Sequence, residues 1–417
     1  MNYTILLYGA TGYSGRMIAA ELSNETRKSD DGVRVILAGR NGRALADLAH
    51  ELGVDYRTFQ LSTRDEVAAK LVDVDLVINA AGPFALTATR LAKAALAADC
   101  HYLDINGEFG VYQQMDDLGL SAAARKRVLL CSAGHTSAAS SLLLNAALKS
   151  LAGAIPPGTE ARGLGAIRLA MSQLLSLSRG SVETMWSSIR EQVTVVRRGR
   201  VQDGSGTAVT RQILWHEPVG KLERTVFFAD PARTDDDAVT RKARIVTAVN
   251  LVDTLTAQQT VERDGFLADR IESYVEANTA ARLAYQLAAF AAPIAALPVS
   301  RELARAQFSV LPDGPTEHEL ATEPHTIVLE IEDRFQTRII DWHWHTPNPY
   351  VFTARVVVEL AQRVMRTSLN GWLTPCDLVD KRLEDLTADS GFLRGCRLKM
   401  RAQPTPQPQS VGQPRTV

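Results

Sequence analysis

Cysteine is scarce in this chain. The 417 residues include four cysteines, Cys100, Cys131, Cys376 and Cys396, and no two of them form a CxxC pair. Without paired or regularly spaced cysteines, the sequence predicts neither a zinc site nor a disulfide framework. Such cysteine usage is typical of a reducing compartment. Because Met1 and Asn2 lead directly into an apolar run, with no signal segment before it, we expect a cytoplasmic protein.

An excess of charge of either sign is also lacking. Lys and Arg together number 46, and Asp and Glu together number 47. This balance argues against a nucleic-acid-binding surface and against an acidic interaction tail. The chain is too long for one compact core, so we expect at least two domains.

Long apolar runs are few, and residues 283–299 come nearest to one. They are rich in Ala and include Phe290, but Pro293 and Pro298 interrupt them. A spanning helix needs about 20 predominantly apolar residues. We therefore expect a buried or interfacial helix here, which leaves open a weak contact with a membrane surface.

What the chain does have is a glycine-rich turn between an apolar strand and a helix. Residues 5–8 are continuously apolar, and three glycines spaced three apart follow them. In a dinucleotide-binding turn, such glycines allow a sharp bend, close approach of the pyrophosphate, and tight packing of helix on strand. The N-terminus of the helix then faces the phosphates with unpaired N–H groups. The expected cofactor contacts of this turn are Gly9, Thr11, Gly12, Tyr13, Ser14 and Gly15.

The end of the second expected strand, residues 33–40, indicates which dinucleotide is bound. An acid at this place would hold the ribose 2′-hydroxyl of NAD, whereas an Arg accommodates the 2′-phosphate of NADP. The stretch offers Arg40, Asn41 and Arg43 and no acid, so we expect NADP(H). The alternative is that both arginines are solvated loop charges.

Four further strands continue the alternation with helices. The fourth strand, residues 75–82, ends in small residues that would let a nucleotide come close. The second set of expected cofactor contacts is Asn79, Ala80, Ala81, Gly82, Pro83 and Phe84. The fifth and sixth strands fall within residues 101–108 and 128–134. Six such units over about 150 residues predict a doubly wound, Rossmann-type parallel sheet with ligands at its carboxyl edge.

The region after residue 150 has a different character, because strand patterns become more numerous and more polar. Residues 326–332 and 337–344 alternate apolar and polar side chains and predict a hairpin. His343 and His345 share one face of that hairpin, but no third ligand is evident, so we expect no metal site. The expected fold class is α/β, a doubly wound domain joined to an α+β domain with a mixed or antiparallel sheet.

The expected division of the chain follows from these patterns. Residues 1–150 would bind NADP, 151–346 would form a substrate or dimerisation domain, 347–402 would be helices packing back on the first domain, and 403–417 would be a disordered tail.

Four motifs carry a resemblance to a known family. In chain order, residues 9–15, 38–40, 79–84 and 102–108 resemble those of the saccharopine dehydrogenase-like superfamily, above all its trans-acting enoyl reductases and saccharopine dehydrogenase-like oxidoreductases. Fainter matches extend it along nearly the whole chain, at residues 177–184, 314–316 and 373–375. The resemblance implies NADP(H) binding and reduction of a C=C or C=N bond.

The chain departs from this family after the sixth strand. Relatives often carry GFDSxPSD there, whereas this chain reads AGHTSAAS at residues 133–140. This loop is expected to face the nicotinamide, so the substrate is not carried over from the family.

Three ionisable residues are candidates for the chemistry beside the cofactor. His135, just past the sixth strand, is a candidate proton donor, or else a capping or packed histidine. Asp104 is a second catalytic candidate, and Glu108 a further cofactor contact. These two would bind an amine or orient a ribose, or else cap the next helix.

Together with the NADP site expected from the residues, the resemblance implies an NADPH-dependent reductase of a biosynthetic intermediate, either a small molecule or carrier-bound. An enoyl and an imine substrate are not distinguished. A contrary hypothesis of another class is an NADP-binding sensor or assembly partner without turnover. The sequence leaves the oligomeric state open, a homodimer included.

Overall fold

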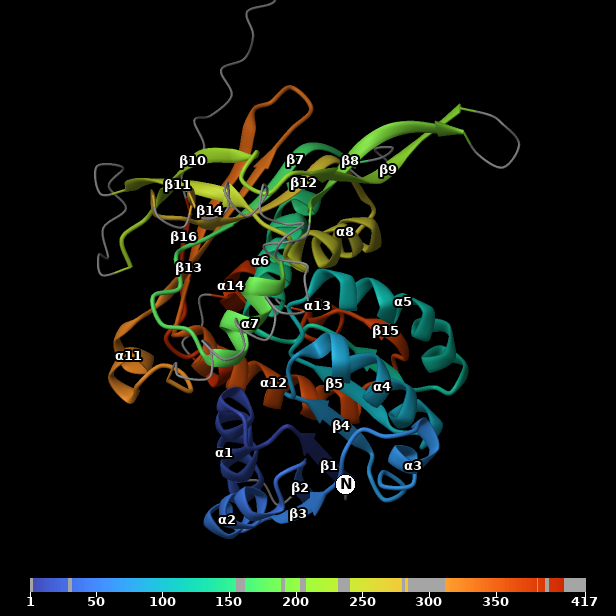
Figure 1. The fold of residues 1–417 in the computed structure, drawn as a ribbon. Coiled ribbons are helices and arrows are strands. Elements are labelled where there is room, and N and C mark those ends of the chain that lie inside the picture. Colours follow the sequence, from blue (N-terminus) through green and yellow to red (C-terminus); the bar gives the residue numbers. More distant parts are fainter. Residues whose placement is uncertain are drawn as a thin grey trace, which may run out of the picture.

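A computed structural model describes most of the chain, and its described residues are 3–28, 32–154, 162–188, 192–202, 208–231, 241–279, 282–283, 312–380, 382–386 and 390–400. These residues form two β-sheets with helices around them, and the long helix α6 (His135–Ala154) runs between the two (Figure 1). Segment 283–299, apart from Leu283, and the tail from residue 403 lie outside the described residues.

The first sheet is the expected doubly wound one. Its strands lie in the order β15-β6-β5-β4-β1-β2-β3, and every neighbouring pair is parallel. Their bounds are β1 (Tyr3–Tyr8), β2 (Val33–Gly39), β3 (Asp55–Thr58), β4 (Leu76–Asn79), β5 (His101–Asp104), β6 (Val128–Leu130) and β15 (Gly371–Leu373). Its helices are α1 (Tyr13–Lys28), α2 (Gly42–Leu52), α3 (Arg64–Ala68), α4 (Phe84–Ala97) and α5 (Phe109–Ala124).

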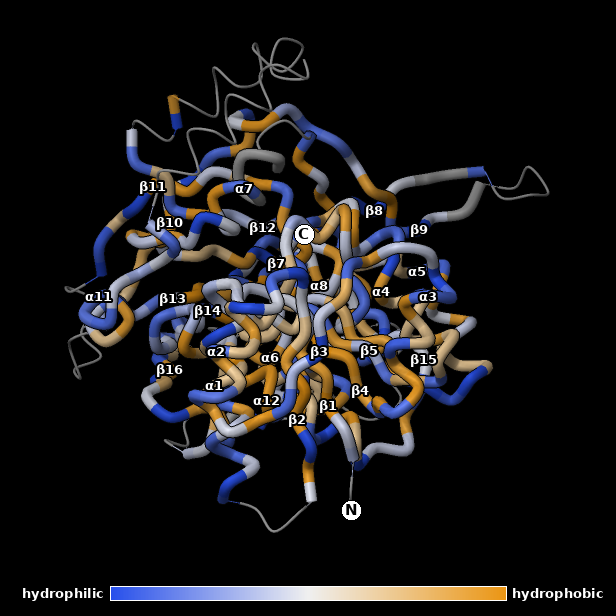
Figure 2. Tube along the Cα trace, turned by 60° about the horizontal axis from the view of Figure 1, so that its bottom comes forward, coloured by the Kyte–Doolittle hydropathy of each residue, from blue (hydrophilic) through white to orange (hydrophobic). Residues whose placement is uncertain are grey.

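The strands of this sheet are apolar because both of its faces are covered. Leu7 belongs to the core shared with α1 and α6, whereas its neighbour Leu6 belongs to the core shared with α4 and α5. Both side chains are fully buried, and the strands at the centre of Figure 2 are coloured mostly hydrophobic. Continuous apolar strands of this kind are typical of a parallel sheet between two helical layers.

One strand of this sheet was not expected. The six strands read from the sequence are joined by β15, which pairs with β6 although more than 200 residues separate them. Its Trp372 packs against Tyr112 of α5, with ring centroids 4.8 Å apart. A three-residue strand has too short a pattern to be recognised, and its place depends on this tertiary contact.

The second sheet is mixed, as expected. Its main path runs β10-β11-β12-β7-β13-β14-β16, in which β12 and β7 are parallel and the other neighbours antiparallel. Strands β8 and β9 form a hairpin that attaches to β12 and projects from the body (Figure 1). The bounds are β7 (Arg162–Met171), β8 (Val193–Gln202), β9 (Ala208–Glu217), β10 (Glu223–Phe228), β11 (Lys242–Ala248), β12 (Phe266–Glu276), β13 (His325–Glu332), β14 (Arg338–Thr346) and β16 (Arg397–Met400). The expected hairpin is β13 and β14, with its turn at residues 333–337.

The last part of the chain is shared between the two sheets. Helix α12 packs against α1 and α6, and β15 extends the first sheet, whereas β16 pairs with β14 of the second. The remaining helices are α7 (Arg179–Ser188), α8 (Asp253–Arg263), α11 (Glu317–Thr322), α12 (Pro349–Arg366), α13 (Pro375–Leu378), α14 (Leu383–Leu386) and the 3-10 turn η2 (Gly391–Leu393).

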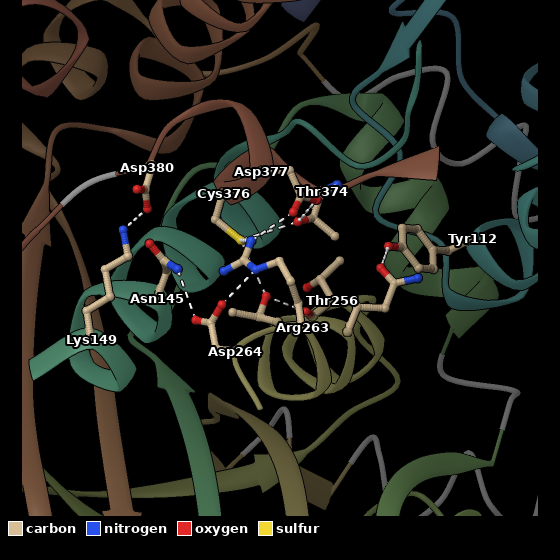
Figure 3. A network of polar contacts seen from close by, with 12 residues as sticks. Tyr112, Asn145, Lys149, Thr256, Arg263, Asp264, Thr374, Cys376, Asp377 and Asp380 are labelled. Carbon is tan, nitrogen blue, oxygen red and sulfur yellow. Dashed lines mark hydrogen bonds and ion pairs between the residues drawn. The ribbon is translucent and has the colours of Figure 1, made fainter. Parts of the chain in front are cut away.

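A polar network holds α8 against α13 and α6 (Figure 3). The Arg263 guanidinium donates to Asp264 at 2.8 Å, to Asp377 at 2.9 Å and to the Cys376 sulfur at 3.0 Å. Asn145 of α6 donates to the other Asp264 oxygen at 3.2 Å. Arg263 and Asp264 thus connect α8 with α13 and with α6.

Candidate functional site

The cavity at the carboxyl edge of the first sheet

A cavity of about 1130 Å³ lies between the carboxyl edge of the first sheet and the second sheet. Residues of the first sheet line one end, including Gly12, Arg40 and Ala81, and residues such as Met171, Val275 and His325 of the second sheet line the other. This is where a doubly wound sheet binds its ligands. The volume is large enough for a dinucleotide together with a second molecule.

The glycine-rich turn forms the floor of one end. Gly9 has a φ of +85°, and a side chain there would lie 2.6 Å from the Ala81 nitrogen. A Cβ on Gly15 would lie 2.1 Å from the Gly9 oxygen, so these two glycines permit the packing of α1 on the strands. A Cβ on Gly12 would meet only the Gly9 oxygen, at 3.4 Å. The space above Gly12 is therefore open to a ligand, as a pyrophosphate site requires.

Five of the six residues expected from this turn line the cavity, and they are Gly9, Thr11, Gly12, Tyr13 and Ser14. The sixth, Gly15, is not among the described lining residues. Arg16, which the sequence analysis did not single out, lines the cavity as well, and its Nε donates to the Thr11 carbonyl at 3.1 Å. The sequence pattern around Arg16 did not distinguish it from a solvent-exposed arginine on the surface of the helix.

The end of β2 brings a second arginine to the same cavity. Among the described lining residues, Arg40 and Asn41 are present and Arg43 is not. Asn41 also caps α2, accepting a hydrogen bond from the Ala44 nitrogen at 3.2 Å. The lining residues numbered 8–107 include Arg16 and Arg40 and no carboxylate. This end of the cavity therefore fits the 2′-phosphate of NADP better than the bare ribose of NAD.

Some residues at the end of β4 line the cavity, and others support the residues that do. Ala80, Ala81, Gly82 and Phe84 line the cavity. Asn79 is fully buried instead: it accepts from the Ala81 nitrogen and donates to the Tyr102 hydroxyl, both at 3.0 Å. Neither Asn79 nor Pro83 is among the described lining residues, and the contacts of Asn79 support the loop that follows β4.

The two carboxylates expected near the site face the protein interior. Asp104 accepts from the Ser132 nitrogen at 2.8 Å, the Asn106 nitrogen at 3.0 Å and the Tyr102 hydroxyl at 3.0 Å, and burial raises its pKa to about 6. It is fully buried and is not among the described lining residues. Its contacts with Ser132, Asn106 and Tyr102 hold the ends of β5 and β6 together.

Glu108 has a similar supporting role. Its two oxygens accept from the nitrogens of Phe84 and Ala85, each at 3.0 Å. It therefore caps α4, the helix that precedes it in the chain, although the sequence suggested the next one. A carboxylate is favourable there because the first N–H groups of a helix are unpaired and carry partial positive charge. Glu108 is also not among the described residues that line the cavity.

His135 lies where the two ends of the cavity meet. It is the first residue of α6, and its backbone nitrogen donates to Thr353 at 2.9 Å. Its Nε2 lies 2.8 Å from the Thr346 hydroxyl, and its ring packs edge-on against His325 and Phe352. Burial, assisted by His325, lowers the pKa of His135 well below its usual value. The ring is therefore uncharged at neutral pH and is not a ready proton donor.

Several lining residues come from positions that the sequence analysis did not connect with the cavity. The Tyr350 hydroxyl accepts from the Ser178 nitrogen at 2.7 Å and lies 2.8 Å from the Ser181 hydroxyl. Its ring packs edge-on against Tyr13 of the glycine-rich turn, at 5.1 Å. The fainter family match at residues 177–184 gave no reason to expect this contact, because the partner on α12 is about 170 residues away in the chain and has no local signature.

The two strand histidines, His343 and His345, contact other groups of the protein. His343 accepts from the Ala229 nitrogen at 3.2 Å and contacts Asp341 at 2.9 Å, and His345 contacts the Thr326 hydroxyl at 2.8 Å. In the described part of the chain, no three His, Cys, Asp or Glu side chains gather as metal ligands would. None of the helices described there has the length and apolar character needed to cross a membrane.

Comparison with known proteins

Sequence comparison identifies the first part of the chain. Residues 5–131 match the family model of the saccharopine dehydrogenase NADP binding domain. A trans-acting enoyl reductase of Mycobacterium bovis is 29% identical over 128 residues, which is 30% of each chain, and one of Mycobacterium leprae is 27% identical over 136 residues, 31% of this chain and 32% of the relative. The alignments thus span less than a third of these relatives' own length. Within residues 5–131 the resemblance read from the motifs is confirmed.

Two solved structures share the fold along nearly the whole chain. Apo saccharopine dehydrogenase (L-Glu forming) from Saccharomyces cerevisiae has a TM-score of 0.56 at 11% identity, covering 96% of this chain and 100% of that one. The homospermidine synthase of Legionella pneumophila in complex with NAD has a TM-score of 0.54 at 10% identity, covering 99% and 95%. At such identities the likeness establishes the α/β fold and no more.

Proposed function

We propose that this protein is an NADPH-dependent reductase that transfers hydride to a C=C or C=N bond of a biosynthetic intermediate, free or carrier-bound. The observation that carries the proposal is a single cavity with two different ends. One end has the open glycine-rich turn and two arginines, and the other is lined by apolar side chains such as Met171 and Val275 together with polar ones such as Gln173 and Glu276. The matched NADP-binding domain and the trans-acting enoyl reductases among the relatives support it.

Residues at one end of the cavity would bind the cofactor, and residues at the other end would contact the substrate. The turn at Gly12 and the start of α1 would hold the diphosphate, and Arg40 with Arg16 would hold the 2′-phosphate. NADPH, when bound, supplies the hydride. Met171, Val275 and their apolar neighbours would exclude water from the reacting bond. His135 would contact the substrate and orient it, because its ring is neutral and its Nε2 is already engaged with Thr346.

The proposal is tested by measuring NADPH binding and NADPH oxidation separately. We expect binding by calorimetry, and loss of NADPH absorbance with at least one member of a panel of enoyl thioesters and imines. His135→Ala should slow that oxidation at least about tenfold while leaving the NADPH affinity unchanged, because the residue lies on the substrate side. His318→Ala, at an exposed position on α11, is the matched control.

Two outcomes would count against this function. Tight NADPH binding with no oxidation across the panel would favour a nucleotide-binding sensor or assembly partner. Unchanged turnover in His135→Ala would remove the role given to His135 and leave the reductase assignment in place.

A further inference from the structure

The proposed reduction needs a proton as well as a hydride. When hydride reaches one atom of a C=C or C=N bond, the electron pair of that bond moves to the other atom, which must then be protonated. The two candidates read from the sequence do not fit this task. Burial lowers the pKa of His135 well below its usual value, and Asp104 is not among the described lining residues. Hydroxyl groups on the wall of the cavity are the next candidates.

Three linked hydroxyl groups line the cavity, and they belong to Ser178, Ser181 and Tyr350. The Ser181 Oγ lies 3.1 Å from the Ser178 Oγ and 2.8 Å from the Tyr350 hydroxyl. Two backbone N–H groups donate into the same cluster, from Ser178 to the Tyr350 hydroxyl at 2.7 Å and from Ser181 to the Ser178 Oγ at 3.2 Å. Ser178 and Tyr350 are buried, whereas Ser181 is partly exposed.

One hydroxyl hydrogen of this cluster has no acceptor. Each hydroxyl carries one hydrogen, and each contact between two hydroxyls uses one. Three hydrogens therefore serve two contacts, and one hydrogen is left over. In the described part of the chain, no further group accepts from these three hydroxyls. An unpaired donor is least costly where a ligand or water reaches it, so the spare hydrogen belongs on the partly exposed Ser181.

The cluster lies between the glycine-rich turn and the start of α6. The Tyr350 ring packs edge-on against Tyr13 of the turn, with centroids 5.1 Å apart. Three residues further along α12, the Thr353 hydroxyl accepts from the backbone nitrogen of His135 at 2.9 Å. Ser181, in the first turn of α7, is therefore held close to the place where the two ends of the cavity meet.

We propose that Ser181 donates a hydrogen bond and then its proton to the substrate, and that Tyr350 replaces that proton. The Ser181 O–H bond breaks as its proton passes to the substrate atom that has received the electron pair. The Tyr350 proton passes to the Ser181 Oγ, and solvent water returns a proton to Tyr350. The Ser178 N–H, which already donates to the Tyr350 oxygen, stabilises the negative charge formed there.

This inference rests on the proposed function, because the proton accompanies a hydride transfer. It makes Ser181 a catalytic residue and Tyr350 a positioning and relay residue behind it. Neither role could be read from the sequence, since the two residues are 169 positions apart.

The first test measures a single turnover of bound NADPH with the panel compound that is reduced fastest. Ser181→Ala should slow this step at least about tenfold, whereas Ser181→Thr, which retains a hydroxyl, should recover most of the rate. Ser121→Ala, at an exposed position on α5, is the matched control. An unchanged rate in Ser181→Ala would overturn the proton donor.

Tyr350→Phe tests the second step of the relay. This variant keeps the ring that packs against Tyr13 and removes the hydroxyl group alone. In mixtures of H₂O and D₂O, the single-turnover rate of the unmodified chain should depend on the deuterium fraction along a curve, because two protons move together. The dependence should become a straight line in Tyr350→Phe. A straight line in the unmodified chain would overturn the relay, and a loss of packing would not produce this change.

The second test needs no turnover and compares two probes of similar shape. Cyclohexanone carries a hydrogen-bond acceptor where methylenecyclohexane carries none. By ligand-observed NMR on the NADP⁺-loaded full chain, Ser181→Ala should weaken cyclohexanone binding about two- to tenfold and leave the affinity for methylenecyclohexane unchanged. Ser181→Thr should retain the cyclohexanone affinity. Equal changes for the two probes, or none for either, would overturn the donor, and the melting temperature reports that each variant is folded.

The results separate this inference from the proposed function. Unchanged turnover in Ser181→Ala would overturn the proton donor and leave the reductase in place. The expected loss of cyclohexanone affinity, in a protein that oxidises NADPH with no compound, would uphold Ser181 as a hydrogen-bond donor to ligands and remove the reductase function.

Discussion

Gly12→Ala should separate cofactor binding from folding. Among the residues that the structure describes, a Cβ at this position would meet one atom, the Gly9 oxygen, at 3.4 Å, which is an ordinary van der Waals contact. We therefore expect the free energy of unfolding to change by less than about 1 kcal/mol. The new methyl group would instead occupy the open space above the turn, where the diphosphate must approach the backbone.

The expected loss of affinity follows from the hydrogen bonds that the methyl group prevents. A hydrogen bond to a charged group contributes about 1.5–3 kcal/mol, and each 1.4 kcal/mol is about a tenfold change in Kd. Losing one such bond should weaken NADPH binding about ten- to hundredfold. Gly110→Ala is the matched control, since a Cβ on this α5 residue meets no described atom within 4 Å and Gly110 is not among the described lining residues.

Calorimetric titration with NADPH and thermal unfolding of the unliganded chain make the comparison. Gly15→Ala supplies the opposite result, because its Cβ would lie 2.1 Å from the Gly9 oxygen and should lower the melting temperature. Wild-type NADPH affinity in Gly12→Ala would refute the placement of the diphosphate above this turn. A large loss of stability in Gly12→Ala would refute the inference that the space above Gly12 is open.

Three further outcomes are expected. Arg40→Ala should weaken NADPH binding at least about tenfold and leave NADH binding nearly unchanged, while Arg43→Ala should do neither; calorimetry with both nucleotides decides. Burial lowers the pKa of His325 from 6.5 to about 4, so the unfolded chain takes up the proton at a higher pH than the folded chain. The contribution of His325 to the free energy of unfolding, complete above pH 6.5, should therefore fall by up to about 3 kcal/mol as the pH drops towards 4. Urea unfolding of His325→Phe should show a smaller fall in stability over that pH range, and an unchanged pH dependence would contradict the lowered pKa. Arg263→Met should lower the free energy of unfolding by about 1–2 kcal/mol, since its ion pairs are partly solvent-exposed, whereas the exposed Arg64→Met should have little effect in the same assay.

Much of the first domain could be predicted because its information is local. The turn needs glycine at Gly9 and Gly15, and this requirement is visible in one short run of strand, turn and helix residues. The absence of an acid near Arg40 is likewise visible in one short stretch. The hairpin of β13 and β14 was equally readable, because alternating side chains mark strands with two different faces.

The contacts that shape the cavity could not be predicted in the same way. Glu108 caps the preceding helix, and Asp104 ties two strand ends together, because the fold brings their backbone donors within reach. The carboxylates looked available for chemistry when only their position near a strand end was known. His135 likewise looked like a proton donor until its burial beside His325 was known.

The sequence by itself determined that this chain has a doubly wound domain with a dinucleotide turn, because glycine requirements and apolar periodicity act over a few neighbouring residues. Tertiary structure alone decided which polar groups face the cavity. Hydrogen-bond partners such as Ser172 and His325, or Ser178 and Tyr350, lie more than 150 residues apart in the chain, so only folding determines which nitrogen of a histidine is paired.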